Sequence, residues 1–340
     1  RHGYGSAYKD WYVNLDFSRR SAQGDCFEYE GWAGCKDLVK LNGDSGAVRE
    51  HLFGAVKMWI EEFGIDGLRL DAADVLSKNF LDTLGAFCRS IKPDFWLMGE
   101  VVHGDYAEWT RNGRLDSVTN YQIYKALWSC LNDQNMYELS YNLDREYNSE
   151  RGVYRDSALY NFVDNHDVNR AVSALNKPER HIHLLYGLLF TIPGIPSIYY
   201  GSEYGIRGVR SHNCDYELRP PLPPFGKLPD FTAPGFDAGF IRTSITTFAK
   251  IRRQHPALQR GSYRQEFVAN RQFGFWREYC EYNEEKILII VNADFAQGFV
   301  SLHSIPAGEY ESLTDGRVYH SDALKGLQMP PCSILILRKK

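Results

Sequence analysis

Acidic residues recur where the predicted β-strands end. Asp71 closes the segment 65–71, Glu100 closes the segment 95–100, and Asp167 follows a third strand-like segment. Two such carboxylates can cleave a glycosidic bond when one attacks the anomeric carbon and the other protonates the leaving oxygen, then activates water. Strand-end Asp and Glu also cap helices and join structural ion pairs, so for each residue alone that second interpretation stays open.

The neighbours of two of these acids would set their protonation states. Arg69 lies two residues before Asp71, so both side chains face the same side of a strand, and a cation there would hold Asp71 anionic. The apolar run 95–98 would help to keep Glu100 protonated. A retaining glycosidase needs both states, because its nucleophile is ionised while its acid carries a proton. The pattern therefore favours a carbohydrate-cleaving site.

Strand-like and helical patterns alternate over the first two thirds of the chain, which predicts βα units and a parallel sheet. Asp71 and Glu100 are 29 residues apart, about one βαβ unit. Acids at the carboxyl ends of the strands would lie on the active-site face of a βα-barrel or at the binding edge of a doubly wound sheet. We expect strands at 65–71, 95–100, 158–163 and 195–200, and helices at 47–63, 79–91, 179–190 and 240–255, with a further helical region ending near 148.

The pattern changes after the proline-rich segment 219–224 and a last long helix. Residues 273–279, 286–291 and 333–337 are short apolar runs between turn residues. Such runs are typical of β-strands, and we expect a separate all-β domain, a sandwich.

Composition excludes several classes of protein. The 340 residues are 44% hydrophobic and 24% charged, with a net charge of −4, so the chain can bury a core and lacks the basic surface of a nucleic-acid-binding protein. No apolar run approaches the ~18 residues of a membrane span, and no glycine-rich phosphate motif is present. We expect neither nucleic acid nor a membrane as partner. Aromatic residues reach 14%; such residues fill cores and also stack against sugars.

The seven cysteines are odd in number and contain no C-x-x-C pair. This argues against a disulfide framework or a zinc site and favours a reducing compartment. We expect a cytoplasmic protein.

Five segments resemble, in the same order, motifs of the alpha-amylase family (glycoside hydrolase family 13). Residues 67–71 (GLRLD) are similar to its strand-four motif, and residues 99–101 (GEV) to its strand-five motif. Residues 162–167 (FVDNHD) closely match the strand-seven motif, and residues 194–201 (GIPSIYYG) resemble the strand-eight signature. Residues 215–219, which begin with Asp and end with Arg, resemble the loop that binds the next sugar on the non-reducing side.

The resemblance implies a TIM (β/α)8-barrel catalytic domain and assigns roles to single residues. Asp71 is the implied nucleophile, Glu100 the general acid/base, and Asp167 the stabiliser of the transition state. The implied substrate-binding residues are Arg69, His166, Asp215 and Arg219. The family needs no organic cofactor, and calcium binding is left open because the usual calcium-ligating Asn is missing.

Two further residues have open interpretations. His103, close to Glu100, is a candidate sugar contact or a surface or helix-capping residue. Trp32 is a candidate stacking platform or a buried side chain.

Finer features indicate a subgroup. Residues 38–42 (LVKLN) are similar to the M-P-K-L-N element of neopullulanases and cyclomaltodextrinases. Asp74 and Val75 stand where many alpha-amylases have Lys-His, so we expect a preference for short maltooligosaccharides or cyclodextrins over long starch.

The front of the chain departs from the family pattern. Residues 1–70 contain no D-x-V-x-N-H motif of barrel strand three, so we expect a barrel that lacks its N-terminal strands. The expected division is a remnant of the domain B insertion at 1–44, barrel strands four to eight at 45–257, and the β-sandwich at 258–340.

The predicted function is that of a retaining hydrolase of α-glucosidic, mainly α-1,4, bonds in maltooligosaccharides, cyclodextrins or starch. Two alternatives stay open. One is an α-glucan transglycosylase, and the other is an inert amylase-like binding protein in which the expected truncation has abolished turnover. The predicted partner is the α-glucan, and the sequence does not indicate an oligomeric state.

Overall fold

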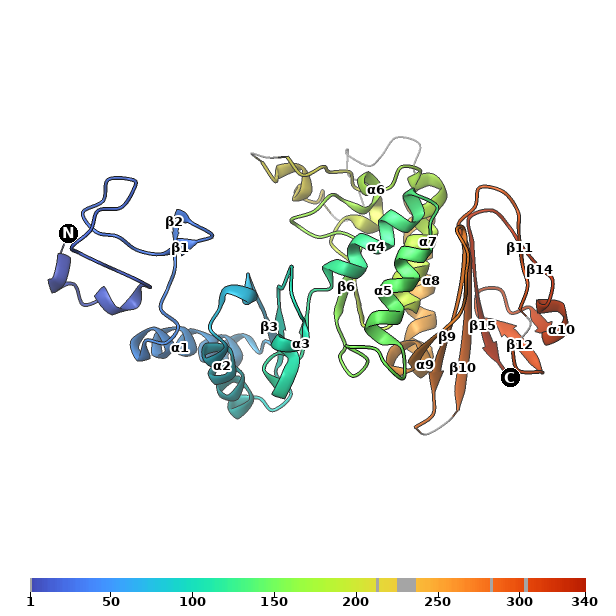
Figure 1. The fold of residues 1–340 in the computed structure, drawn as a ribbon, viewed down its shortest axis with the longest axis horizontal. Coiled ribbons are helices and arrows are strands. Elements are labelled where there is room, and N and C mark those ends of the chain that lie inside the picture. The colour runs from blue at the N-terminus through green and yellow to red at the C-terminus, as the bar shows by residue number, and fades with distance from the viewer. Residues whose placement is uncertain (1, 212–213, 225–236, 282–283, 303–304) are drawn as a thin grey trace. The chain divides into compact units, whose positions relative to one another are not determined.

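Parallel strands alternate with helices from residue 46 to residue 197, as the sequence predicts. The computed structural model describes residues 2–211, 214–224, 237–281, 284–302 and 305–340. Contacts within the chain divide it into two compact units, Arg1–Val118 and Thr119–Lys340 (Figure 1). This boundary falls inside the segment 45–257 expected for the barrel, and the three-domain division stays a prediction.

The first unit contains a parallel sheet of three strands in the order β3-β4-β5, with Leu70 of β3 opposite Gly99 of β4. Helices α1 and α2 pack against each other. The segment before them is mostly irregular and carries one short antiparallel hairpin, β1–β2. The elements of this unit are β1 (Gly31–Trp32), β2 (Cys35–Val39), α1 (Gly46–Phe63), β3 (Gly67–Leu70), α2 (Lys78–Ile91), β4 (Trp96–Gly99), α3 (Ala107–Thr110) and β5 (Ser117–Val118), with 3-10 turns at Gly3–Gly5, Lys9–Trp11, Ala73–Val75 and Arg111–Gly113.

Local signals explain where the helices of the first unit begin and end. Helix α1 stops at Gly64, whose φ of +67° is the left-handed conformation that glycine adopts freely, and the Gly64 N–H bonds the carbonyl of Ile60. Helix α2 begins after Ser77, whose side chain accepts a hydrogen bond from the Phe80 N–H at 3.1 Å. Both predicted helices are confirmed to within one residue at either end.

The second unit begins with helices and two parallel strands, β6 and β7, and Thr119 forms a parallel bridge to Tyr160 of β6. The helical region expected up to residue 148 is two helices, α4 and α5, with Gln134 at a φ of +49° between them. The elements are α4 (Tyr121–Asn132), α5 (Tyr137–Tyr147), β6 (Tyr160–Phe162), α6 (Ala171–Ala174), α7 (Pro178–Thr191), β7 (Ile195–Ser197), α8 (Ala238–Gln254) and α9 (Pro256–Arg260), with 3-10 turns at Ser202–Tyr204 and Tyr216–Leu218.

An antiparallel sheet of six strands forms the end of the chain, in the order β13-β12-β15-β10-β9-β8. It confirms the predicted all-β character of this region. Its elements are β8 (Ser262–Val268), β9 (Gln272–Tyr279), β10 (Glu285–Asn292), β12 (Glu309–Ser312), β13 (Val318–His320) and β15 (Ser333–Lys339), and the smaller elements β11 (Gly298–Val300), α10 (Ser321–Leu324) and β14 (Leu327–Met329) lie beside it.

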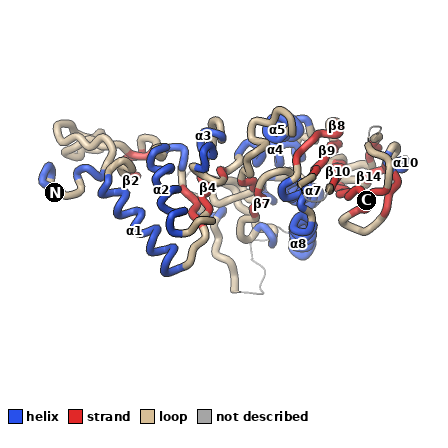
Figure 2. Tube along the Cα trace, turned by 90° about the horizontal axis from the view of Figure 1, so that it is seen from below, coloured by secondary structure: helices blue, strands red, loops and turns tan. Residues whose placement is uncertain are grey.

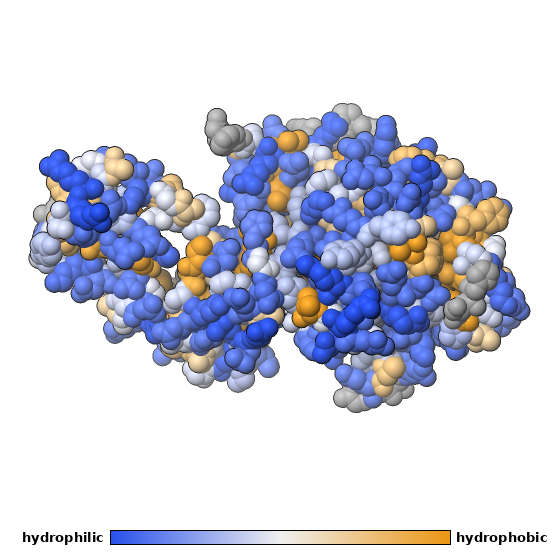
Figure 3. Space-filling view, viewed as in Figure 1, coloured by the Kyte–Doolittle hydropathy of each residue, from blue (hydrophilic) through white to orange (hydrophobic). Residues whose placement is uncertain are grey.

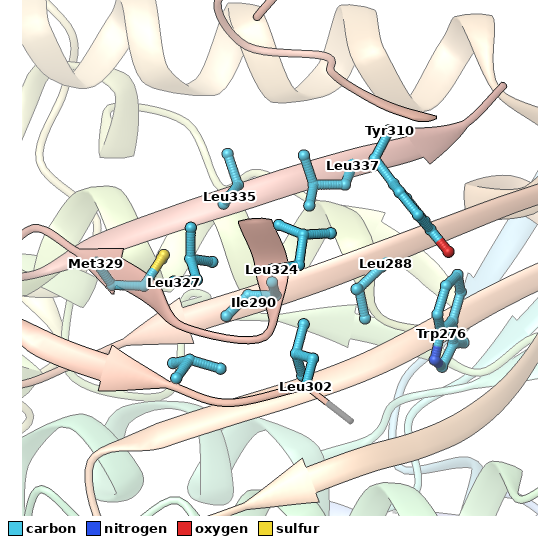
Figure 4. Packing of buried hydrophobic residues seen from close by; sticks show 11 residues of the cluster. Trp276, Leu288, Ile290, Leu302, Tyr310, Leu324, Leu327, Met329, Leu335 and Leu337 are labelled. Atoms are coloured by element: carbon cyan, nitrogen blue, oxygen red, sulfur yellow. The ribbon is translucent and has the colours of Figure 1, made fainter. Parts of the chain in front are cut away.

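Both faces of the central strand β10 are buried. On one face, Leu288 and Ile290 join a cluster with Trp276 of β9 and with side chains of β11, β14 and α10 (Figure 4). On the other, the helices α5, α7 and α9 contact the sheet. Figure 2 shows α5 and α7 beside the strands β8, β9 and β10. Because side chains on both faces of β10 are buried, its sequence is a continuous apolar run and does not alternate between apolar and polar residues.

The surface is mostly hydrophilic in the view of Figure 3, consistent with a mean hydropathy of −0.42. Among the described residues, no helix combines the length and the apolar character that crossing a bilayer requires.

Candidate active site

The first two predicted acids follow neighbouring strands of the same parallel sheet. Asp71 lies in the turn after β3, and Glu100 directly follows β4. The backbone ladder continues past the strand ends, because the Glu100 N–H bonds the Leu70 carbonyl and the Ala73 N–H bonds the Glu100 carbonyl, each at 2.9 Å. These bonds fix both acids at one edge of the sheet, where the sequence predicts the chemistry to occur.

One guanidinium contacts both acids. Arg69 on β3 forms an ion pair with Asp71, and its Nη2 lies 2.9 Å from Oε2 of Glu100. The same oxygen of Glu100 accepts a hydrogen bond from the Ala72 N–H at 3.2 Å. Arg69 and Asp71 thus lie on the same side of the strand and pair, as their spacing predicts. The contact with Glu100 was not predicted, and it adds a cation to the apolar run 95–98 that the sequence places before this acid.

The two acids differ in their access to solvent. The Asp71 side chain is 78% exposed and the Glu100 side chain 11% exposed. Ala72, between them in the turn, has a φ of +42°, a conformation that costs a residue with a side chain about 1–2 kcal/mol. An exposed carboxylate such as that of Asp71 is suited to attack on a substrate, and a mostly buried one such as that of Glu100 is suited to proton transfer.

A cavity of about 1040 Å³ opens beside Asp71 within the first unit. Its lining includes Trp32, Leu38 and Val75, which are 46%, 55% and 42% exposed. The structure therefore places the predicted stacking residue Trp32 on the same cavity as the predicted nucleophile, and Trp32 is not buried. His103 is exposed in the loop after β4.

The remaining predicted site residues come together in the second unit. Asp167 lies in the loop after β6, with its carboxylate 3.0 Å from Nε2 of His166 and 2.8 Å from Nη2 of Arg219. Arg219 also reaches Asp215 at 3.1 Å, and its Nε donates to the His166 carbonyl at 3.0 Å. Two pairs of residues that are about 50 positions apart in the sequence thus form one chain of charge-assisted contacts.

A buried ion pair beneath this group was not anticipated from the sequence. Asp164 and Arg170 are 2% and 0% exposed, and Nε of Arg170 lies 3.3 Å from Oδ2 of Asp164. Ser202 donates to the same carboxylate at 2.7 Å. Burial raises the pKa of Asp164, while the charge of Arg170 opposes the rise. The one sequence feature that could have pointed to this ion pair is Asp164, an acidic residue within the motif 162–167.

No group of three or more His, Cys, Asp or Glu side chains among the described residues is arranged to hold a metal ion. Calcium also takes backbone carbonyl and side-chain amide oxygens as ligands, so calcium binding stays open, as it was from the sequence.

Comparison with known proteins bears directly on these motifs. The family model "Alpha amylase, catalytic domain" matches residues 3–276. The chain belongs to the alpha-amylase family. The match spans every predicted site residue and confirms the resemblance.

Among relatives in this family, a cyclomaltodextrinase from Bacillus sp is 27% identical over 308 residues, which cover 87% of this chain and 50% of the relative. Neopullulanase 2 from Thermoactinomyces vulgaris is 31% identical over 218 residues, which cover 62% of this chain and 36% of the relative. The chain thus spans half or less of the length of these relatives. The subgroup that they represent is the one the sequence indicates.

The fold has solved counterparts. The alpha-amylase from Geobacillus thermoleovorans, solved in complex with acarbose, superposes with a TM-score of 0.80 at 24% identity, covering 99% of this chain and 73% of that one. This likeness confirms an amylase-type fold with a C-terminal β domain. The parallel strands of the described residues form two separate sheets, β3-β4-β5 and β6-β7, and the barrel that lacks its N-terminal strands stays a prediction.

Proposed function

We propose that the protein is a retaining glycoside hydrolase that cleaves α-1,4-glucosidic bonds in short maltooligosaccharides and cyclodextrins. The observation that carries the proposal is the sharing of Arg69 between Asp71 and Glu100 at the ends of adjacent parallel strands. Pairs of carboxylates positioned on one edge of a sheet are the machinery of double-displacement glycoside cleavage.

In the first step, a carboxylate oxygen of Asp71 forms a bond to the anomeric carbon. The bond from that carbon to the glycosidic oxygen breaks, and Glu100 gives its proton to the leaving oxygen. In the second step, Glu100 takes a proton from water while the water oxygen attacks the anomeric carbon and releases Asp71. The family resemblance assigns to Asp167, which contacts His166 and Arg219, the stabilisation of the positive charge that develops on the sugar ring.

The substrate class is supported by the cavity beside the nucleophile. Its exposed apolar side chains, Trp32 and Val75, offer surfaces to the apolar face of a glucose ring. The names of the relatives, cyclomaltodextrinase and neopullulanase, point to cyclodextrins and pullulan as substrates of those proteins. A cytoplasmic location is supported by the cysteines, all seven of which are free thiols.

The test is release of reducing sugar from maltotriose and cyclodextrin by the protein and by three variants. Asp71→Asn and Glu100→Gln should lower kcat on the order of 10⁴-fold or more. Asp66→Asn, an exposed acid at the opposite end of β3 that pairs with Lys92, is the matched control and should retain activity. Full activity of Asp71→Asn would disprove the assignment.

Azide rescue separates the two roles. With an activated substrate such as 4-nitrophenyl α-maltoside, Glu100→Gln plus azide should give the α-glycosyl azide, because azide replaces water in the second step. Azide acting on an Asp71→Gly variant should give the β-anomer by direct displacement. The reverse pairing of variant and anomer would exchange the two roles.

The two alternatives are outcomes of the same assay. Accumulation of oligomers longer than the substrate at high maltotriose, exceeding released glucose and maltose, would identify a transglycosylase. Binding of maltotriose without any turnover would identify an inert amylase-like binding protein.

A further inference from the structure

We propose that Arg170 and Tyr200 are positioning residues that hold Arg219 in place against Asp167. The inference rests on the proposed function, in which Arg219 and Asp167 contact the sugar. Neither Arg170 nor Tyr200 belongs to that contacting set.

The two residues form hydrogen bonds with the backbone carbonyls directly before and directly after Arg219. Nη1 of Arg170 donates to the carbonyl of Leu218 at 3.1 Å, and the Tyr200 hydroxyl donates to the carbonyl of Pro220 at 3.0 Å. Arg170 also donates to the Tyr200 carbonyl, so the two residues are joined to each other. We call Arg170 and Tyr200 the Arg219 clamp.

The clamp also reaches His166. The guanidinium of Arg170 lies 4.4 Å from the centroid of the Tyr199 ring, within the range of a cation–π contact. The Tyr199 ring also lies beside the rings of Tyr200 and His166, with 4.6 Å and 6.4 Å between centroids. Both partners of Asp167 therefore have a physical connection to Arg170, one through the backbone and one through an aromatic ring.

A buried arginine held this way has little freedom to move. Arg170 is 0% exposed and pairs with Asp164, which Ser202 and the Ala171 N–H also bond. The backbone N–H of Arg170 donates a hydrogen bond to the backbone carbonyl of Gly208 at 3.0 Å. A Cβ on Gly208 would lie 2.9 Å from Cγ of Arg170 and 2.4 Å from the Glu217 carbonyl oxygen. The loop that carries Asp215 and Arg219 thus lies directly against the arginine.

Only a forked cation can make these contacts together. The guanidinium offers five N–H donors in a fixed plane, whereas lysine offers a single ammonium. Arg170 contacts Asp164 and the carbonyls of Leu218 and Tyr200 at the same time. The single ammonium of a lysine cannot replace all three contacts. We therefore expect Arg170→Lys to fold and to lose the position of Arg219.

The first experiment compares Arg170→Lys with Arg277→Lys. Arg277 is also a buried arginine, 1% exposed, that donates to the carbonyls of Thr191 and Gly261, but it contacts no predicted site residue. Both variants should lower Tm. Only Arg170→Lys should lower kcat/KM for maltotriose per folded molecule, by ~10-fold or more, because small misplacements of a contacting group are costly. Equal kcat/KM in both variants would overturn the proposal.

A double-mutant cycle tests whether the effect passes through Arg219. In an Arg219→Ala background the further loss caused by Arg170→Lys should shrink, because its target is already gone. If the fold losses in kcat/KM of the two single variants multiply in the double variant, Arg170 does not act through Arg219.

Tyr200→Phe keeps the test decisive if Arg170→Lys does not fold. It removes one hydroxyl from a residue that is 37% exposed, so Tm should stay within a degree or two while KM rises. An unchanged KM would overturn the clamp.

Two readouts remain if the protein has no turnover, in which case the proposed function fails separately. Maltotriose binding by calorimetry should weaken in Arg170→Lys and not in Arg277→Lys. Hydrogen exchange of the described residues 214–220 should quicken in Arg170→Lys alone. Unchanged binding and unchanged exchange would both count against the clamp.

Discussion

Arg69 and Glu100 form an ion pair across the ends of two adjacent parallel strands, with 2.9 Å between Nη2 and Oε2. The other branch of the same guanidinium pairs with Asp71. Because a guanidinium is planar and rigid, it fixes the relative placement of the two oxygens that it binds. Arg69 therefore positions Glu100, the proposed acid/base, relative to Asp71, the proposed nucleophile.

Arg69→Lys should lower kcat on the order of 100-fold, because an ammonium cannot hold two carboxylates in fixed geometry. Steady-state kinetics on maltotriose measure this change. Arg89→Lys is the control, since Arg89 pairs with Asp116 in the same unit at 3.0 Å and should retain nearly full activity. Equal losses in both variants would mean that Arg69 only stabilises the unit.

Trp32→Ala should raise KM for maltotriose about 3- to 10-fold with little change in kcat, as expected for loss of one aromatic stacking contact. Trp32 lines the cavity beside Asp71 and is 46% exposed. Trp59→Ala is the control, because Trp59 is 39% exposed on helix α1 and does not line that cavity. A large fall in kcat with unchanged KM would contradict a simple binding role.

The parts of this structure that could be predicted from sequence are those with local signals. Helix α1 has periodic apolar residues and a glycine directly after its last residue, and β10 is a run of mostly apolar residues. Asp71 and Glu100 could be placed because parallel strands end at one edge of a sheet. Each of these inferences needs only neighbours along the chain.

The missed features depend on contacts between distant segments. Nothing in residues 95–100 reveals that Arg69 pairs with Glu100, and Arg170 has no local pattern that predicts complete burial. The break between α4 and α5 was missed because it occurs in a stretch without glycine or proline, where Gln134 takes a positive φ. Burial and pairing of this kind follow from packing rather than from periodicity.

Ile290→Ala should lower the free energy of unfolding of the second unit by about 2–5 kcal/mol, since it leaves a cavity in a closed core. Ile290 is 0% exposed in the cluster of Figure 4. Phe299→Ala is the control, because Phe299 is 68% exposed on β11 and should cost little. Urea unfolding followed by tryptophan fluorescence measures both. Equal midpoints for the two variants would show that this cluster is not a tightly packed core.

Glu146 makes stability depend on pH. It is 0% exposed, and burial raises its pKa from 4.5 to about 7, although hydrogen bonding from Asn120 and the charge of Arg145 oppose the rise. Between those two pKa values the folded protein keeps a proton that the unfolded chain has released, so stability falls as pH rises and levels off above about 7. The full effect of the shift is about 3 kcal/mol, at 1.36 kcal/mol per unit.

Glu146→Gln keeps the shape of the side chain and cannot ionise, so its stability should lack this decline. The difference in unfolding free energy between the variant and the unmodified protein should therefore grow in favour of the variant from pH 4.5 to pH 7.5, by up to about 3 kcal/mol. Taking the difference cancels other groups that titrate in this range, including the buried His181 and the partly buried His183, whose pKa values are lowered by burial. Glu150→Gln, an exposed neighbour, should give a flat difference. A flat difference for Glu146→Gln as well would mean that this carboxyl ionises in the folded protein as it does in the unfolded chain.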